Sequence, residues 1–235
     1  MSDVRQQKQM SPEHPPGFDA ARRVVELGRA AFFAHAEEDI PIADSPIIQA
    51  DDRLPQFGYV GSGYSRSGIL LLGINPGNGP RAARNAGDEA VMPYLSSFVE
   101  HPTPENFLLA QQAYQRSCQG WLLWGRECNE LLAAAGVSMN DIAFSNALPW
   151  RTKSESGFKV AIERRAAENY LAPLLDDLKP KVLVAVGKKV SRMLGNIGRI
   201  DASVVVWNRE RALRPSVIQE REQAAMQFAR LIFQP

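Results

Sequence analysis

Four short runs of apolar residues, each bounded by glycine or polar residues, recur along the chain. Runs of this length without polar alternation are typical of strands buried on both faces of a parallel sheet. They lie at residues 68–73, 141–145, 181–186 and 202–206. Each leads into a polar or glycine- and proline-rich segment, and ligand sites in parallel sheets form beyond the carboxyl ends of the strands. The pattern therefore predicts four buried strands and a candidate site at one edge of their sheet.

Segments with apolar residues at helical spacing separate these strands. The first runs from Phe18 to about Glu38, and the last from about Ser216, a candidate N-cap, to Phe233. The other predicted helices cover residues 104–116, 120–135, 159–176 and 188–195. Strands that alternate with helices indicate a doubly wound, mostly parallel sheet with helices on both faces. The expected fold is a single α/β domain around a four-stranded sheet.

The remaining segments are predicted to be irregular. Residues 1–16 are polar and contain prolines, so we expect a disordered tail before an α/β domain over residues 17–235. Residues 41–67 are rich in Pro, Gly, Ser and Asp, which predicts a loop with room for a short strand near Tyr59. A chain of 235 residues is long enough for one sizeable core.

Composition narrows the class of protein. Hydrophobic residues make up 45% and charged residues 23%, as in ordinary globular proteins. No stretch approaches the roughly 18 apolar residues of a membrane helix, and the polar N-terminus lacks the apolar core of a signal peptide. We therefore expect a cytoplasmic monomer without a membrane partner. Two cysteines, Cys118 and Cys128, and three scattered histidines predict no disulfide framework and no metal site.

Charge is distributed unevenly. The net charge is only +1, which argues against a purely electrostatic nucleic-acid binder. Basic residues nevertheless far outnumber acidic ones between Lys179 and Arg221. Within that span Lys188 and Lys189 follow a glycine at a predicted helix start. They are either a solvated helix end or contacts to a nucleic-acid phosphate.

The segment after the first strand carries candidate chemistry. In Gly73-Ile-Asn-Pro-Gly77, a strand ends at a glycine and the Asn75 amide follows on a turn stiffened by proline. Gly77 lets a ligand approach the backbone closely. The segment matches neither the phosphate-binding Walker loop nor the dinucleotide-binding glycine fingerprint. The alternative is an ordinary strand-to-loop turn with a capping asparagine.

This segment resembles the first motif of the mismatch-specific and single-strand-selective branches of the uracil-DNA glycosylase superfamily. The resemblance implies that Asn75 positions the water that attacks the sugar C1′, and that the amides around Ile74 and Gly77 hold the base or the water. Residues 144–149, Phe-Ser-Asn-Ala-Leu-Pro, resemble the segment whose asparagine, here Asn146, reads the Watson–Crick edge of a flipped uracil. Residues 178–187 resemble the penultimate strand and turn of the superfamily.

The segment after the last strand departs from the superfamily. Most members have His-Pro-Ser or Asn-Pro-Ser there, whereas this chain continues from Trp207 without a histidine. The resemblance then implies that Asn208 takes the position of the catalytic asparagine and that Leu213 wedges into the duplex. Phosphate contacts are expected from Arg209, Arg211 and Arg214. A solvated surface loop is the alternative.

Aromatic residues supply the remaining candidates. A ring is expected to stack on the flipped base, and Tyr94 and Phe98 are the nearest aromatic residues after the first motif. Both are also suitable core residues. Trp150 either lines the mouth of the cleft or is buried.

The resemblance predicts a monofunctional DNA glycosylase that hydrolyses the N-glycosidic bond of a flipped uracil or modified pyrimidine, such as a hydroxymethylated or glycosylated base. The implied mechanism needs no metal or organic cofactor. Its partner is duplex or single-stranded DNA, and its role is base excision repair or defence against foreign modified DNA. Two alternatives remain, because fold alone does not fix function. One is a catalytically silent nucleic-acid-binding module, favoured by the missing histidine. The other is a nucleotide- or nucleoside-directed small-molecule enzyme.

Overall fold

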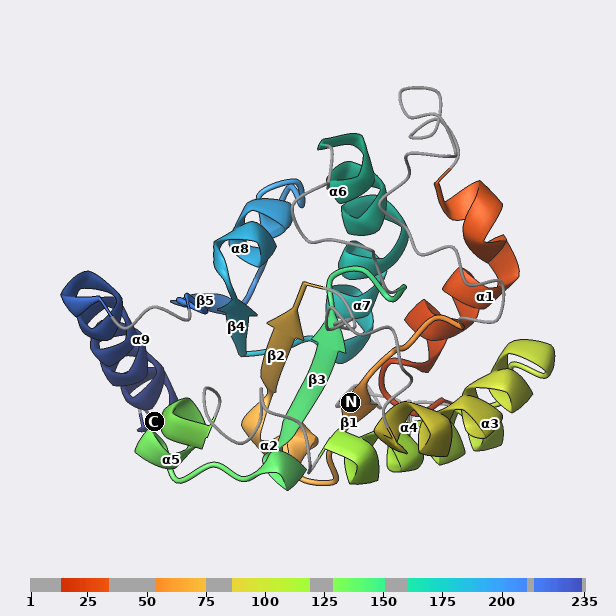
Figure 1. The fold of residues 1–235 in the computed structure, drawn as a ribbon, viewed down its shortest axis with the longest axis horizontal. Helices are drawn as coiled ribbons and strands as arrows, with labels where there is room; N and C mark the ends of the chain where they lie inside the picture. The colour runs from red at the N-terminus through yellow and green to blue at the C-terminus, as the bar shows by residue number, and fades with distance from the viewer. Residues whose placement is uncertain are drawn as a thin grey trace, which may run out of the picture.

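The chain folds around a mostly parallel sheet with helices on both faces. The computed structural model describes residues 14–33, 54–74, 86–118, 129–150, 160–210 and 214–233. Within these ranges the sheet has five strands in the order β1-β3-β2-β4-β5 (Figure 1). The strands are β1 (Tyr59–Val60), β2 (Ile69–Gly73), β3 (Ile142–Asn146), β4 (Val182–Val186) and β5 (Ser203–Trp207). The predicted α/β class and the mostly parallel sheet are confirmed.

The predicted number of strands is wrong, because β1 adds a fifth strand antiparallel to β3. Gly58 and Gly61 allow the backbone around β1 to lie close to the backbone of β3 and of the turn before it. A β-carbon on Gly58 would lie 1.9 Å from the carbonyl oxygen of Phe144, and one on Gly61 would lie 2.3 Å from that of Asn140. Only glycine fits at these two positions. A strand of two residues is too short to show the alternation by which strands are recognised.

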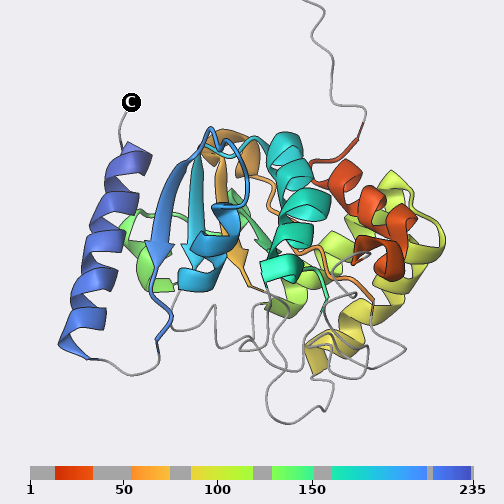
Figure 2. The ribbon, with the colours of Figure 1, turned by 90° about the horizontal axis from the view of Figure 1, so that it is seen from above.

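The helices form two layers. They are α1 (Phe18–Phe32), α2 (Tyr64–Ser67), α3 (Ala86–Glu100), α4 (Pro104–Cys118), α5 (Asn129–Ala134), α6 (Val160–Ala166), α7 (Ala172–Leu178), α8 (Lys188–Leu194) and α9 (Pro215–Phe233), with a 3₁₀ turn η3 (Met139–Asp141) and a π-helical turn η5 (Ala167–Leu171). Figures 1 and 2 show α5 and α9 on one side of the sheet and α6, α7 and α8 on the other.

Side chains of β3 alternate between the two faces of the sheet. The Phe144 ring stacks against Tyr114 of α4, with ring centroids 6.3 Å apart. The next residue, Ser145, points to the opposite face, where its Oγ lies 2.7 Å from Tyr170 Oη of η5. Ser145 Oγ donates its own proton to the Phe57 carbonyl at 3.2 Å, so the Tyr170 hydroxyl, whose pKa burial raises far above its usual range, donates to Ser145.

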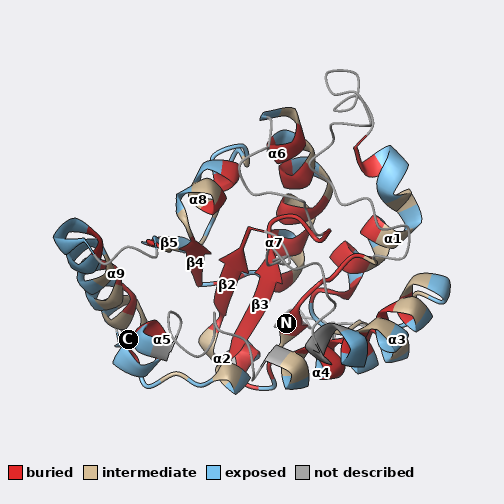
Figure 3. Ribbon diagram, in the orientation of Figure 1, coloured by how far each residue is buried: buried red, intermediate tan, exposed pale blue. Residues whose placement is uncertain are grey.

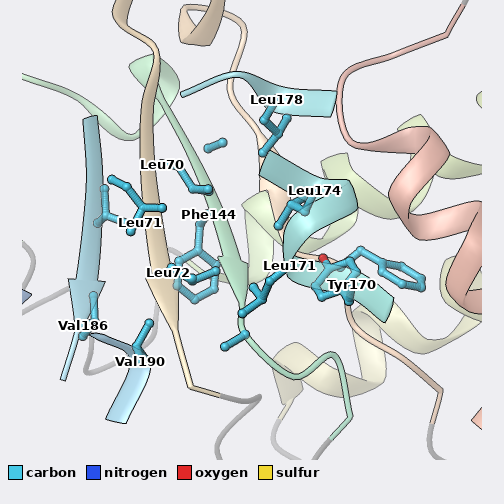
Figure 4. Close-up of a cluster of buried hydrophobic side chains, with 14 of the residues drawn as sticks. Leu70, Leu71, Leu72, Phe144, Tyr170, Leu171, Leu174, Leu178, Val186 and Val190 are labelled. Carbon is cyan, nitrogen blue, oxygen red and sulfur yellow. The ribbon is translucent and has the colours of Figure 1, made fainter. Parts of the chain in front are cut away.

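The core lies along the three inner strands. All residues of β2, β3 and β4 are buried (Figure 3). Tyr170, Leu171 and Leu174 pack beside β3, as Figure 4 shows. At the outer edge β5 is more open, and Val206 is 38% exposed. No helix in the described ranges is long and apolar enough to cross a membrane.

Most helices agree with the sequence pattern, although α2 lies within the predicted loop over 41–67 and the helix predicted over 159–176 contains the π-helical turn η5. Helix α1 begins at Phe18 as expected and ends at Phe32, and residues 34–38 of the predicted helix lie outside the described ranges. Helix α3 is not among the predicted helices, and it contains Pro93 in its interior. Of the predicted tail, His14 is described, and its ring lies 4.7 Å from the Phe18 ring.

Candidate functional site

The four parallel strands end at one edge of the sheet, and in Figure 2 the strand arrows run lengthwise toward this edge in the lower part of the picture. At this edge β2 and β3 stay paired beyond their last residues. Gly73 lies opposite Asn146 in the register. The Ala147 amide then donates to the Gly73 carbonyl at 2.7 Å, and the Leu148 amide donates to the Ile74 carbonyl at 2.9 Å. Ile74 and Asn146, two of the predicted site residues, are therefore brought together on adjacent segments.

The Asn146 side chain is buried at this edge, with 3% of the residue exposed. It lies over Gly73, where a β-carbon would be only 2.7 Å from Asn146 Oδ1. Any side chain on Gly73 would displace the amide, so the glycine that ends β2 makes room for the asparagine that ends β3. The side-chain oxygen of Asn146 therefore lies next to the backbone of β2 at Gly73.

The nitrogen side of the same amide is unused. Asn146 Nδ2 is buried and has no hydrogen-bond partner in the part of the chain that the structure describes. An unsatisfied buried donor costs about 1–3 kcal/mol. Native proteins retain few such groups, and a functional site is one reason for retaining them. Among the described residues this leaves one buried donor without a partner at the carboxyl edge.

Gln56 is a second buried amide at this edge, and no pattern in the sequence indicates it. Its backbone amide donates to the Pro149 carbonyl at 2.8 Å. The residue is 4% exposed, and its Oε1 is buried without a hydrogen-bond partner among the described residues. Two residues of strand do not reveal their direction, so the position of the residues before β1 is not readable from the sequence.

The carboxyl ends of β4 and β5 carry basic residues. Lys188 begins α8, and a β-carbon on Gly187 would lie 4.0 Å from the Arg209 β-carbon. Lys188 Nζ lies 3.5 Å from a carboxylate oxygen of Glu220 in α9. Lys189 follows in the same helix, and Arg214 is exposed directly before α9. These predicted DNA contacts share the edge with Asn146.

Asn208 is buried next to these basic residues, and its amide is used within the protein. Its Nδ2 donates to Glu220 Oε2 at 2.6 Å, and its Oδ1 accepts from the Glu210 amide at 2.9 Å. Its carbonyl accepts from Arg221 Nε at 2.9 Å. The Arg221 guanidinium also lies 5.6 Å from the centroid of the Trp207 ring. These contacts fasten the end of β5 to α9, and a catalytic role for Asn208 stays a prediction.

The two candidate stacking aromatics differ in environment. Phe98 is fully buried in α3, where its ring centroid lies 5.2 Å from Phe107 and 5.7 Å from Phe57. Tyr94 of the same helix is 37% exposed. Trp150 is buried, with its ring centroid 4.7 Å from that of Phe32.

Several predicted site residues lie outside the described ranges. They are Asn75, Gly77, Arg211 and Leu213. The described residues contain no group of three or more His, Cys, Asp or Glu side chains that could hold a metal ion. Comparison with protein-family models and with curated proteins finds no match for this chain.

Proposed function

We propose that the protein is a monofunctional DNA glycosylase that hydrolyses the N-glycosidic bond of a flipped uracil or modified pyrimidine. The observation that carries the proposal is the Asn146 amide, which is buried at the carboxyl edge with Nδ2 unpartnered among the described residues. A carbonyl oxygen of a base inserted at this edge would accept a hydrogen bond from that nitrogen. Base-excising enzymes read an extruded base by such contacts to its Watson–Crick edge.

The same donor suits the chemistry of bond cleavage. When the N-glycosidic bond breaks, both of its electrons go to the base, and the sugar becomes oxocarbenium-like. Negative charge then accumulates on the base oxygens, where a preorganised donor such as Asn146 Nδ2 stabilises it. Water adds to C1′ and releases a proton, which finally resides on the base or in solvent. In this proposal Asn75, which directly follows Ile74 in the chain, orients that water.

DNA is proposed to lie along the same edge. Lys188, Lys189, Arg209 and Arg214 supply positive charge near the ends of β4 and β5 for contacts to backbone phosphates. Arg211 and the wedge residue Leu213 belong to the proposal by sequence position. The base pocket near β2 and β3 and the phosphate contacts near β4 and β5 would then share one DNA-facing surface.

The direct test is release of free base from oligonucleotides that contain uracil, 5-hydroxymethyluracil or a glycosylated pyrimidine, single-stranded and duplex, with EDTA present. We expect release of at least one of these bases. Asn75→Ala should lower that rate by orders of magnitude while DNA affinity is retained, because it removes a contact made in the transition state. Asn78→Ala in the same segment is the matched control.

The outcomes separate the proposal from its alternatives. Tight DNA binding without release of any base would support a silent binding module. Hydrolysis of free nucleosides without DNA binding would support a small-molecule enzyme. An Asn75→Ala variant that releases the cognate base at the wild-type rate would contradict the assigned role of Asn75.

A further inference from the structure

Gln56 lies where a base edge would be read. Strand β1 runs antiparallel to β3, so the residues before β1 lie beside the carboxyl end of β3. The bond from the Gln56 amide to the Pro149 carbonyl, 2.8 Å long, fixes this position. Gln56 thus reaches the same edge as Asn146 from the opposite flank of the segment that follows β3.

The two residues offer complementary groups. The buried side-chain amide atoms without a hydrogen-bond partner in the described chain are Gln56 Oε1, an acceptor, and Asn146 Nδ2, a donor. Asn146 Oδ1 lies against the Gly73 backbone. The acceptor that a single asparagine would present beside its donor is therefore supplied from another residue.

Fully buried amides elsewhere in a protein normally find partners within the fold. Two adjacent segments that each bury an unused amide atom, of opposite hydrogen-bonding character, indicate a ligand that satisfies both. A base edge carries such groups. Uracil and its 5-substituted derivatives present the N3–H donor next to a carbonyl acceptor, whereas cytosine presents an N3 acceptor next to an amino donor.

We propose that Gln56 is a second base-reading residue, whose Oε1 accepts a hydrogen bond from the base while Asn146 Nδ2 donates one. The inference rests on the proposed function and specifies its substrate class. The ligand is a pyrimidine with a donor next to an acceptor on its Watson–Crick edge, and the uracil type is the expected one. Both buried amide atoms are then satisfied in the complex.

The test compares Gln56→Met with Gln111→Met. Methionine keeps the length of glutamine and removes the acceptor. Gln111 is also buried, in α4, where its side chain is near Gly17 and Leu178 and away from the carboxyl edge. Measured quantities are kcat/KM on uracil, 5-hydroxymethyluracil and cytosine in single-stranded DNA, and the melting temperature of each variant.

For Gln56→Met we expect kcat/KM on the preferred base to fall by about 10- to 100-fold, because the substitution removes a hydrogen bond to the base. Its melting temperature should stay equal or rise, since a buried unpaired oxygen disappears. Gln111→Met should keep kcat/KM.

If Gln56 is only structural, the result is reversed: the melting temperature of Gln56→Met falls and the rate per folded molecule is unchanged. That result would overturn the inference. If cytosine is preferred, Gln56 still reads the base and the uracil assignment is overturned.

A substrate-side measurement keeps the test decisive if Gln56→Met does not fold. Wild-type protein is assayed on uracil and on 3-methyluracil, which lacks the N3–H donor. Equal rates would overturn a uracil-reading role of Gln56, whereas discrimination supports it. If no base is released at all, the proposed function fails. Binding of uracil- and 3-methyluracil-containing single strands, measured by fluorescence anisotropy, then decides the role of Gln56 independently.

Discussion

Asn146 and Asn208 are two buried asparagines at the same edge of one sheet, one at the end of β3 and one directly after β5. They differ in how their amides are used. Asn208 bonds to Glu220 through its nitrogen and to the Glu210 amide through its oxygen. Asn146 rests its oxygen over Gly73, and its nitrogen has no partner among the described residues. Residue type, depth and topological position are matched, so the partners alone separate a structural asparagine from a candidate binding residue.

The difference shows how to weigh a buried polar residue at a sheet edge. An amide whose bonds are complete within the fold stabilises that fold, and replacing it leaves its partners unsatisfied. An amide with an unused atom destabilises the empty protein slightly and gains its partner from a ligand. The two residues should therefore respond oppositely to substitution.

The largest effect is expected for Asn146→Ala. Loss of a donor to the leaving base should lower the excision rate by about 10²- to 10³-fold, the usual effect of removing one oxyanion-type donor. The melting temperature should change little. Single-turnover excision and thermal unfolding of the same preparation measure both quantities. A full rate with a lowered melting temperature would show that Asn146 belongs to the fold alone.

Asn208→Ala should show the opposite behaviour. It removes the hydrogen bonds to the Glu220 carboxylate, which keeps Lys188, and to the Glu210 amide, and we expect the free energy of unfolding to fall by about 1–2 kcal/mol. Denaturant unfolding measures this change, and the excision rate per folded molecule should be near that of the wild type. A rate loss at unchanged stability would instead assign Asn208 the catalytic role expected from the sequence.

A smaller effect concerns the arginines beside Asn208. Arg209→Gln and Arg214→Gln should weaken DNA binding equally for all sequences, since phosphate contacts carry no base information. The slope of log affinity against log salt should decrease by about one unit for each phosphate that is no longer neutralised. Arg230→Gln, near the far end of α9, is the control. If both variants keep the wild-type slope of log affinity against log salt, the DNA does not contact Arg209 and Arg214.

The smallest effect is expected at Asp177 of α7, whose carboxylate accepts a hydrogen bond from the backbone amide of Ala20 in α1. Burial raises the pKa of this carboxyl, although the Ala20 amide and its neighbours at the start of α1 oppose the shift. The folded protein then binds more protons than the unfolded chain, whose aspartates titrate at about 3.9. Stability should fall slightly as pH rises from that value through the raised pKa. The stability of Asp177→Asn, measured by unfolding over the same pH range, should not show this decline. A pH profile identical to that of the wild type would mean that another group causes the decline.

The sequence revealed those parts of the fold that repeat a strong local pattern. The runs that form β2 to β5 are mostly apolar and bounded by glycine or polar residues, and each predicted strand lies within one residue of the observed one at either end. Helix α3 escapes prediction because Pro93 interrupts a helical pattern. Strand β1 is held by the close approach of Gly58 to Phe144, which only the tertiary structure contains.

The candidate site followed the same rule. Asn146 could be predicted because it ends an apolar strand in a segment that resembles a known motif. The lack of a hydrogen-bond partner for Asn146 Nδ2 among the described residues could not be predicted, because the sequence does not show which side chains surround an amide. The bonds of Asn208 were equally invisible, because Glu220 and Arg221 reach it from α9. Gln56 required the direction of β1, which two residues do not encode.

The antiparallel pairing of β1 with β3 also affects the order in which the protein folds. Tyr59 pairs with Phe144, and a strand of only two residues forms too few ladder hydrogen bonds to offset the entropy of closing the intervening loop unless β3 is already in place. Strand β1 is therefore expected to join the sheet after its parallel strands have assembled, and it brings Gln56 with it. The edge that would read a base in the proposed function is then completed only after the core has formed.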